Sequence, residues 1–305
     1  MKKEILYTTA LDENGLLIFI DDAEKKNEYF CPSCGQKFIL RKSGKTGKGH
    51  RRPHFAHNEL QPNCTPEGVL HSSFKKLTIE FLEKYISENK PLKLTWKCRS
   101  CGRSYSGNLL AKAKTVKEEY TVGNCRPDIA LLDKSGNVIA AIEIVVTHKP
   151  EEQVLQYYND NGIVLIQIDL LSEEDLKNIG EKLSKPDIVD LCFVHQCLGY
   201  KSTKLEREVV SNKIRCKRCQ KEISRFYISI GSVFGICRSR NFTQEEILRV
   251  KSEKPNVKVN IKKSNELPFQ YPIMQCGCMK IHYRRYRESG YYMTKNGNIR
   301  KKRRF

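Results

Sequence analysis

The sequence lacks a long apolar segment. None of its 305 residues lies in an uninterrupted apolar run of 18, and the N-terminal MKKEILYTTA gives way within a dozen residues to the acidic LDEN. A membrane-spanning helix needs about 20 mainly apolar residues, and a secretory leader needs an apolar stretch behind its basic start. We therefore expect no membrane partner and predict a cytoplasmic location.

Acidic residues are fewer than basic ones. The chain has 55 Lys and Arg against 35 Asp and Glu, which gives a formal net charge of +20. Charge of this sign favours a polyanionic partner, most simply DNA or RNA, and disfavours a scaffold with no nucleic-acid role. Net charge carries no information about sequence specificity.

Disulfides are not expected, although the chain has 13 cysteines. A reducing cytosol keeps thiols free, and paired Cys-x-x-Cys spacings suit structural Zn²⁺. The first group consists of CPSCG at 31–35, HFAH at 54–57 and then Cys64. Two thiolates two residues apart converge on one ion, and a later His and Cys can complete a tetrahedron. We predict a zinc site of Cys31, Cys34, His57 and Cys64, with His54 as the alternative histidine.

A second pair, Cys98 and Cys101, has a less obvious completion. The stretch LCFVHQC at 191–197 offers Cys192, His195 and Cys197, two of which could close the site. We assign His195 and Cys197 as its ligands.

A third group near the C-terminus has four sulfurs in two short motifs, CKRC and CGC. This pattern predicts a ribbon-like zinc site formed by Cys216, Cys219, Cys276 and Cys278. The chain is therefore expected to hold two to three Zn²⁺ ions.

The segment 66–88 has apolar residues at helical spacing and is predicted to be an amphipathic helix. His71 and Lys75 stand four residues apart at the border of its apolar face. A border position can point into a cleft.

The stretch RPDIALLDKSGNVIAAIEIVVT reads as two apolar strands joined by the turn DKSGN. Asp128 and Glu143 are equally far from the Ser135–Gly136 junction, so a regular hairpin places their Cβ atoms about 5 Å apart. Two carboxylates that close repel unless a cation lies between them. Glu143 also interrupts a buried apolar run, where an unpartnered charge is rare. These residues predict a divalent-metal site.

The next segment, KPEEQVLQYYNDNG, predicts a helix from about 150 to 161, and IVLIQIDL predicts another buried strand. Strand, helix and strand at this length form a parallel crossover. The expected fold class is α/β, with a mixed sheet flanked by helices and appended zinc modules.

The order CPSCG, HFAH, Cys64, then Glu67, His71 and Lys75, then RPDIAL and AIEIVVTH resembles the competence-protein CoiA-like family of the PD-(D/E)XK nuclease superfamily. The resemblance covers roughly residues 25–170. It implies a PD-(D/E)XK nuclease-like sheet and a metal-dependent phosphodiesterase that acts on DNA. It further implies that Asp128 and Glu143 bind Mg²⁺ or Mn²⁺, with the backbone carbonyl of Ile144 as an additional ligand.

Val145 departs from the superfamily pattern, because the strand's period of two places it where the catalytic lysine would point. Lys75 from the preceding helix, His71 beside it and His148 after the strand are the candidates for the missing role. The interpretation is an Mg²⁺- or Mn²⁺-dependent deoxyribonuclease of DNA uptake, repair or phage defence. The alternative is a catalytically inactive zinc protein that binds nucleic acid or a partner protein.

The positions of the zinc motifs and of the nuclease-like core predict three domains. Residues 1–65 form an N-terminal zinc-finger module, and residues 66–185 form the nuclease-like core with a zinc knuckle inserted near 98–101. Residues 186–305 form a zinc-ribbon region with a basic tail. A protein partner in a defence or DNA-processing complex is expected besides DNA.

Overall fold

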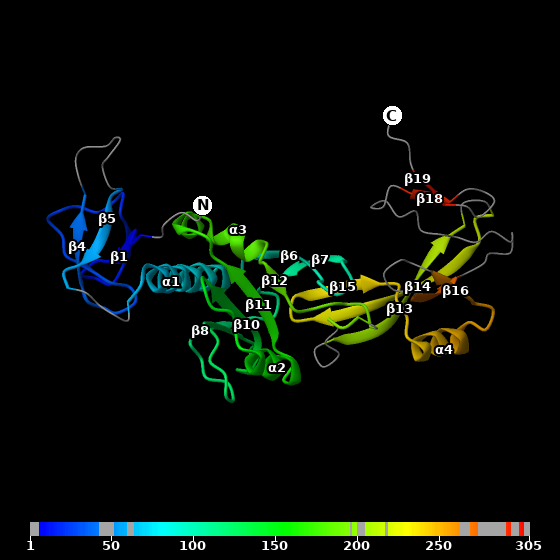
Figure 1. The fold of residues 1–305 in the computed structure, drawn as a ribbon. Helices are drawn as coiled ribbons and strands as arrows, with labels where there is room; N and C mark the ends of the chain where they lie inside the picture. Colours follow the sequence, from blue (N-terminus) through cyan, green and yellow to red (C-terminus); the bar gives the residue numbers. More distant parts are fainter. Residues whose placement is uncertain are drawn as a thin grey trace. The chain divides into compact units, whose positions relative to one another are not determined.

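The computed structural model describes residues 6–42, 52–59, 64–195, 197–199, 205–216, 219–262, 269–273, 291–293 and 299–301. The chain divides into two units (Figure 1). The first contains residues 1–206 and 231–237, and the second contains residues 207–230 and 238–305. The module predicted for residues 1–65 and the core predicted for residues 66–185 both lie in the first unit.

A mixed five-stranded sheet forms the centre of the first unit, with strand order β12-β11-β10-β9-β8. Its strands are β8 (Thr115–Glu118), β9 (Ile129–Leu132), β10 (Val138–Val145), β11 (Val164–Asp169) and β12 (Ile188–Val189). Nearly every residue of β9, β10 and β11 is buried. Continuous apolar strands of this kind are typical of a sheet covered on both faces.

The hairpin between β9 and β10 turns at the predicted DKSGN. The Asp133 carboxylate accepts hydrogen bonds from the backbone N–H groups of Ser135, at 2.8 Å, and Asn137, at 3.0 Å. Gly136 has φ of 81°, in the left-handed region that favours glycine. The antiparallel pairing shifts between Val138 and Ala140 and then runs regularly to the pair Ile142 and Ile129.

The helix α2 (Glu152–Asp160) connects β10 to β11, which pairs with β10 in parallel. The predicted strand, helix and parallel strand are therefore confirmed. Tyr158 of α2 is completely buried and packs in a cluster with Ala130, Ala141 and Leu165 of the sheet.

The long helix α1 (Pro66–Ser87) begins where the sequence predicts. Thr65 caps it, because its Oγ1 accepts a hydrogen bond from the N–H of Gly68 at 3.1 Å, and Pro66 follows at the first helical position. The helix packs against β8, β10 and two further helical elements. These are the 3₁₀ helix η1 (Glu173–Lys177) and α3 (Ile179–Ser184).

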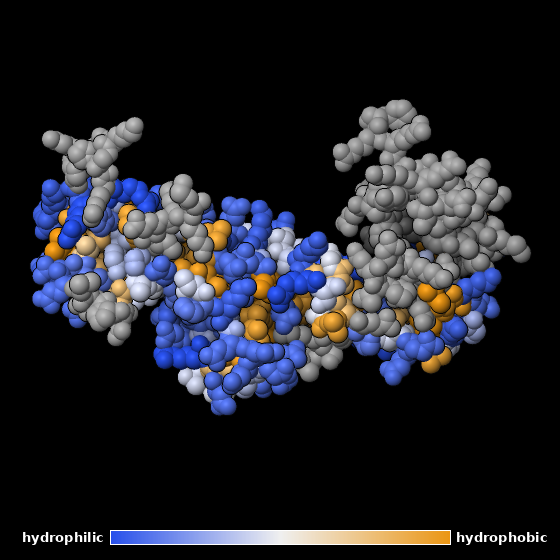
Figure 2. All heavy atoms as spheres, in the orientation of Figure 1, coloured by the Kyte–Doolittle hydropathy of each residue, from blue (hydrophilic) through white to orange (hydrophobic). Residues whose placement is uncertain are grey.

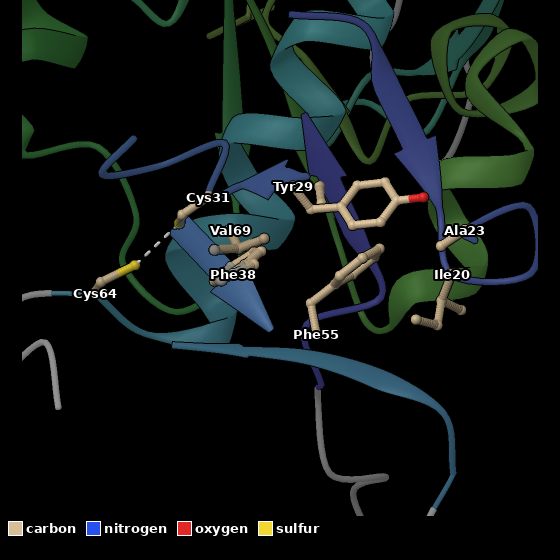
Figure 3. Packing of buried hydrophobic residues seen from close by; sticks show 9 residues of the cluster. Ile20, Ala23, Tyr29, Cys31, Phe38, Phe55, Cys64 and Val69 are labelled. Atoms are coloured by element: carbon tan, nitrogen blue, oxygen red, sulfur yellow. Dashed lines mark hydrogen bonds between the residues drawn. The ribbon is translucent and has the colours of Figure 1, made fainter. Parts of the chain in front are cut away.

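The N-terminal residues form a second sheet with strand order β2-β1-β3-β4-β5. Its strands are β1 (Thr9–Leu11), β2 (Leu17–Phe19), β3 (Tyr29–Phe30), β4 (Lys37–Arg41) and β5 (His54–His57). Figure 3 shows its core, where the rings of Phe38 and Phe55 stack with centroids 5.8 Å apart. Val69 of α1 belongs to the same buried cluster, so the sheet and the start of α1 share one core.

A hairpin of β6 (Lys93–Lys97) and β7 (Ser104–Asn108) carries the middle Cys-x-x-Cys motif at its turn. Trp96 is buried in this hairpin, and its indole Nε1–H donates a hydrogen bond to the carbonyl of Leu191 at 2.8 Å. This bond fixes residue 191 beside the hairpin.

The elements from residue 206 onward are mostly strands. The strands β13 (Glu206–Arg215), β14 (Glu222–Ser232) and β15 (Gly235–Ser239) form a three-stranded sheet, and α4 (Gln244–Glu253) follows. The last strands pair as β16 (Lys258–Lys262) with β17 (Phe269–Ile273) and as β18 (Tyr291–Met293) with β19 (Ile299–Lys301).

Hydrophilic side chains cover most of the described surface visible in Figure 2, with smaller hydrophobic areas between them. Within the described ranges, the helices are all too short or too polar to span a membrane.

Candidate functional site

The first zinc site predicted from the sequence comes together in the structure. The ligand atoms of Cys31, Cys34, His57 and Cys64 all lie within 4.8 Å of one another. The Sγ atoms of Cys31 and Cys64 are 3.4 Å apart (Figure 3), and Cys34 Sγ lies 3.2 Å from His57 Nε2. The alternative, His54, lies outside this cluster.

Electrostatics favour a cation at this cluster. Burial raises the pKa of Cys31 to about 12 and also raises the pKa of Cys64, while burial lowers the pKa of His57. Thiols in this environment keep their protons unless a positive charge compensates the thiolate. Three cysteine sulfurs and one neutral imidazole are a donor set that Zn²⁺ prefers, so this cluster could hold zinc.

The middle cluster differs from the prediction in one ligand. Cys98, Cys101, Cys192 and Cys197 bring their four sulfurs within 4.8 Å of one another, and all four are buried. Cys98 Sγ lies 3.6 Å from Cys197 Sγ, and Cys101 Sγ lies 3.6 Å from Cys192 Sγ. The assignment of His195 is wrong, because that residue is exposed and outside the cluster.

Packing explains why Cys192 replaces His195. Trp96 holds the carbonyl of Leu191, and the ring of Phe193 packs edge-on against Tyr105 with centroids 5.0 Å apart. These contacts direct the intervening Cys192 toward the hairpin turn, where its Sγ lies 3.2 Å from the Tyr105 hydroxyl.

The third Cys-x-x-Cys pair adopts the same turn as the other two. In each turn, the backbone N–H of the first cysteine donates a hydrogen bond to the carbonyl of the residue five positions later. The carbonyl of the same cysteine accepts a hydrogen bond from the N–H of the residue four positions later. The three turns are Cys31–Gln36, Cys98–Arg103 and Cys216–Lys221. The fifth residue is left-handed in all three, with φ of 72° at Gly35, 68° at Gly102 and 57° at Gln220.

Cys216 and Cys219 therefore lie in the same turn that supplies two cysteines to each of the other two clusters. Their predicted partners, Cys276 and Cys278, lie outside the described residues. The third zinc site stays a prediction.

The predicted divalent-metal residues line a hollow of about 410 Å³. Its walls come from the first two turns of α1, from Asp128 and from residues 143–150, so Glu143, Ile144, Val145 and His148 all face it. Glu67 and His71 are the charged or titratable side chains that α1 contributes. The hollow thus gathers most of the residues predicted from the sequence.

Asp128 and Glu143 lie next to one another as the hairpin spacing predicted. Asp128 directly precedes β9, and the pairing of Ile129 with Ile142 places it beside Glu143 on the neighbouring strand. Asp128 Oδ2 accepts a hydrogen bond from the N–H of Ile144 at 2.8 Å and lies 3.0 Å from His71 Nε2. Because an ionised carboxylate only accepts, His71 carries a proton on Nε2 in this contact.

Tyr158 is a site residue that the sequence interpretation missed. Its buried hydroxyl donates a hydrogen bond to Glu143 Oε1 at 2.6 Å. The available signal was its position in the helix that follows the strand of Glu143, on the face that the apolar Val154 and Leu155 mark as buried.

The electrostatics of Glu143 fit a cation site. The pKa of Glu143 is raised to about 7, mainly by burial and also by the negative charge of Asp128, against the lowering effect of the Tyr158 hydrogen bond. Two neighbouring carboxylates and a backbone carbonyl are the hard oxygen ligands that Mg²⁺ and Mn²⁺ prefer. The residues present therefore fit a divalent cation.

Lys75 is not part of this hollow, contrary to the sequence interpretation. Its Nζ lies 2.5 Å from Glu119 Oε1 and 3.1 Å from Glu118 Oε1. A buried amine needs a compensating charge, and these two acids at the end of β8 supply it. His148 does face the hollow, with its Nδ1 2.8 Å from Thr147 Oγ1.

The fold and the clusters define a mixed α/β protein. One cluster of three cysteines and a histidine and one cluster of four cysteines could hold zinc. Residues 19–66 match the model of the family described as Competence protein CoiA, N-terminal domain. The match contains all four residues of the first cluster, and it supports the CoiA-like resemblance for this part of the chain. No curated protein and no solved structure matches the chain.

Substitution of one cysteine tests the ligands of the middle cluster. We expect Cys192→Ser to lower the zinc content of the purified protein by about one ion per chain, because three thiolates hold Zn²⁺ far less tightly than four. His195→Ala is the matched control and should leave the content unchanged. Elemental analysis measures both, and a loss of zinc in the His195 variant would restore the original assignment.

The raised pKa of Glu143 predicts a pH-dependent affinity for Mn²⁺. Below about pH 7 the Glu143 carboxyl keeps its proton. The cation must displace that proton, so the affinity should fall about tenfold per pH unit below 7 and level off above it. Isothermal titration calorimetry at several pH values measures this. Glu143→Gln should bind Mn²⁺ weakly and without that dependence, and a flat profile for the wild type contradicts the assignment.

Proposed function

We propose that the chain is a metal-dependent nuclease that cleaves DNA phosphodiester bonds with a PD-(D/E)XK-type core. The observation that carries this proposal is the pair of carboxylates, Asp128 and Glu143, held side by side in a hollow that is open to a ligand. Two neighbouring carboxylates in a partly buried place repel one another, and a divalent cation bound between them would remove that repulsion.

The topology around the pair supports the proposal. The strands β9 and β10 form an antiparallel hairpin, and α2 then leads to β11, which is parallel to β10. The helix α1 precedes them and contacts β10. This order of elements agrees with the fold that the resemblance to PD-(D/E)XK nucleases implies.

The residues that line the hollow would have different roles in the reaction. Asp128, Glu143 and the carbonyl of Ile144 would hold Mg²⁺ or Mn²⁺. Such an ion polarises a phosphoryl oxygen and lowers the pKa of a water molecule. The Nε2–H group of His71 donates a hydrogen bond to Asp128 and so orients that carboxylate, which leaves Nδ1 as the ring atom that can accept a proton. His148 lines the same hollow and can contact a phosphate group.

The charge of the chain supports nucleic acid as the substrate. The formal net charge of +20 attracts a polyanion, and Lys149 lines the hollow next to His148. The two clusters that could hold zinc have a structural part in this proposal, because each ties distant segments of the chain together.

A second candidate function is a catalytically inactive protein that binds nucleic acid or a partner protein. Val145 favours it, because this apolar side chain lines the hollow where a lysine would stabilise the developing charge. Lys75 also favours it, because its amine is engaged by Glu118 and Glu119 rather than directed at the carboxylates.

A cleavage assay separates the two functions. With Mg²⁺ or Mn²⁺ and several DNA substrates, Glu143→Ala should reduce cleavage about a hundredfold or more while DNA binding persists, because a metal ligand is lost and the basic surface is kept. Glu80→Ala is the matched control, since Glu80 is an exposed acid of α1 away from the hollow.

The converse substitution is Val145→Lys, which should raise the rate by restoring a positive charge beside Glu143. If the wild type cuts no DNA with either ion, the nuclease proposal fails and the inactive binding protein is left. Cleavage that survives in Glu143→Ala would move the active site elsewhere.

A further inference from the structure

Lys75 is the only lysine or arginine among the buried side chains of the described residues, with 6% of its surface exposed. Burial lowers the pKa of this amine, but the hydrogen bonds that it donates to Glu119 and Glu118 outweigh that effect and leave the pKa above its ordinary value. The amine is therefore charged and held by two carboxylates. The sequence interpretation gave it a catalytic role that this position does not support.

Its partner Glu119 occupies a particular place in the chain. Glu119 directly follows β8 and begins the connection that ends at Asp128. Its φ is 44°, in the left-handed region that a residue with a long side chain rarely adopts. Such a conformation is unfavourable and persists only where the surroundings hold it.

Three contacts hold Glu119 in this conformation besides Lys75. Its N–H donates to the carbonyl of Asp128 at 3.0 Å, and its own carbonyl accepts from Arg126 Nε at 3.1 Å. Arg126 also forms an ion pair with the Glu119 carboxylate. The backbone of Glu119 is thus bonded directly to Asp128.

The tip of the same connection is also fixed. Val122 and Cys125 exchange two backbone hydrogen bonds, at 2.9 and 3.0 Å. Gly123 lies so close to Tyr157 of α2 that a Cβ atom on it would be 2.3 Å from the tyrosine hydroxyl. The connection 119–128 is therefore held at its tip by α2 and at its base by Lys75 of α1.

We propose that Lys75 is a positioning residue. Its ammonium group fixes Glu119 and thereby the connection 119–128, so that the Asp128 carboxylate stays beside Glu143 at the hollow. The role of Lys75 at the hollow rests on the proposed nuclease function. Its effect on the conformation of residues 119–128 does not.

A double-mutant cycle tests this inference. Lys75→Met keeps the length of the side chain and removes its charge, and Glu119→Gln removes the partner charge. The control is Lys84→Met, which changes an exposed lysine of the same helix. The readouts are Mn²⁺ affinity by calorimetry, amide hydrogen exchange of residues 119–128 and DNA cleavage.

Each of the two variants should weaken Mn²⁺ binding about tenfold, as loss of a group that orients a metal ligand typically does. Each should also speed amide exchange in residues 119–128. The double variant should lose little more than either single variant, because both substitutions break one contact. The control should match the wild type in all three measurements.

Two results would overturn the positioning role. One is a Lys75→Met protein with unchanged Mn²⁺ affinity and unchanged exchange. The other is a protein in which Lys75→Met stops cleavage while Glu119→Gln does not, since that outcome assigns the chemistry to the amine itself.

The same experiment stays informative if parts of it fail. If Lys75→Met does not fold, Glu119→Gln decides alone, because the Glu119 side chain is 40% exposed and tolerates a neutral amide. If the wild type neither binds Mn²⁺ nor cuts DNA, the nuclease proposal fails, and amide exchange in residues 119–128 still supports or overturns the role of Lys75.

Discussion

The proximity of two carboxylates, Asp128 and Glu143, is the constraint on which the architecture around the hollow depends. Their mutual repulsion and the burial of Glu143 are unfavourable, and together, with burial the larger cause, they raise the pKa of Glu143 to about 7 against the lowering effect of its hydrogen bonds. The surrounding groups compensate in part. Ile144 and His71 contact Asp128 Oδ2, and Tyr158 donates to Glu143 Oε1. One oxygen of each carboxylate is thereby oriented by a neighbour, and this orders the pair for a cation.

The N-terminal cluster contributes to the same hollow through the start of α1. Cys64 directly precedes Thr65, the residue that caps α1, and the carbonyl of Cys64 accepts a hydrogen bond from the Tyr7 hydroxyl at 3.0 Å. Ser33, inside the first Cys-x-x-Cys turn, lies next to Gly68, since a Cβ atom on Gly68 would be in van der Waals contact with Ser33 Oγ at 3.5 Å. A metal ion at this cluster would therefore fix the turn of α1 from which Glu67 faces the hollow. The cluster that could hold zinc and the candidate active site are therefore joined by a few residues of chain.

Local signals in the sequence were sufficient for much of this arrangement. The turn DKSGN marks where the hairpin reverses, and equal spacing from its centre predicted Asp128 beside Glu143. The shift in pairing after Val138, which no local signal predicted, brings Asp128 opposite Glu143 rather than Ile142. Contacts between distant segments were not predictable in this way. The choice of Cys192 depends on the bond from Trp96 to the carbonyl before it, and the partners of Lys75 depend on which strand end lies against α1.

The most direct test of the account is the location of a bound ion. Crystals soaked in Mn²⁺ and measured at the manganese absorption edge should show an anomalous-difference peak between the carboxylates of Asp128 and Glu143. The peak should be absent in crystals of Glu143→Gln prepared in the same way. Wild-type crystals in which manganese is found only elsewhere, or not at all, would contradict the central claim that this pair of acids is a divalent-metal site.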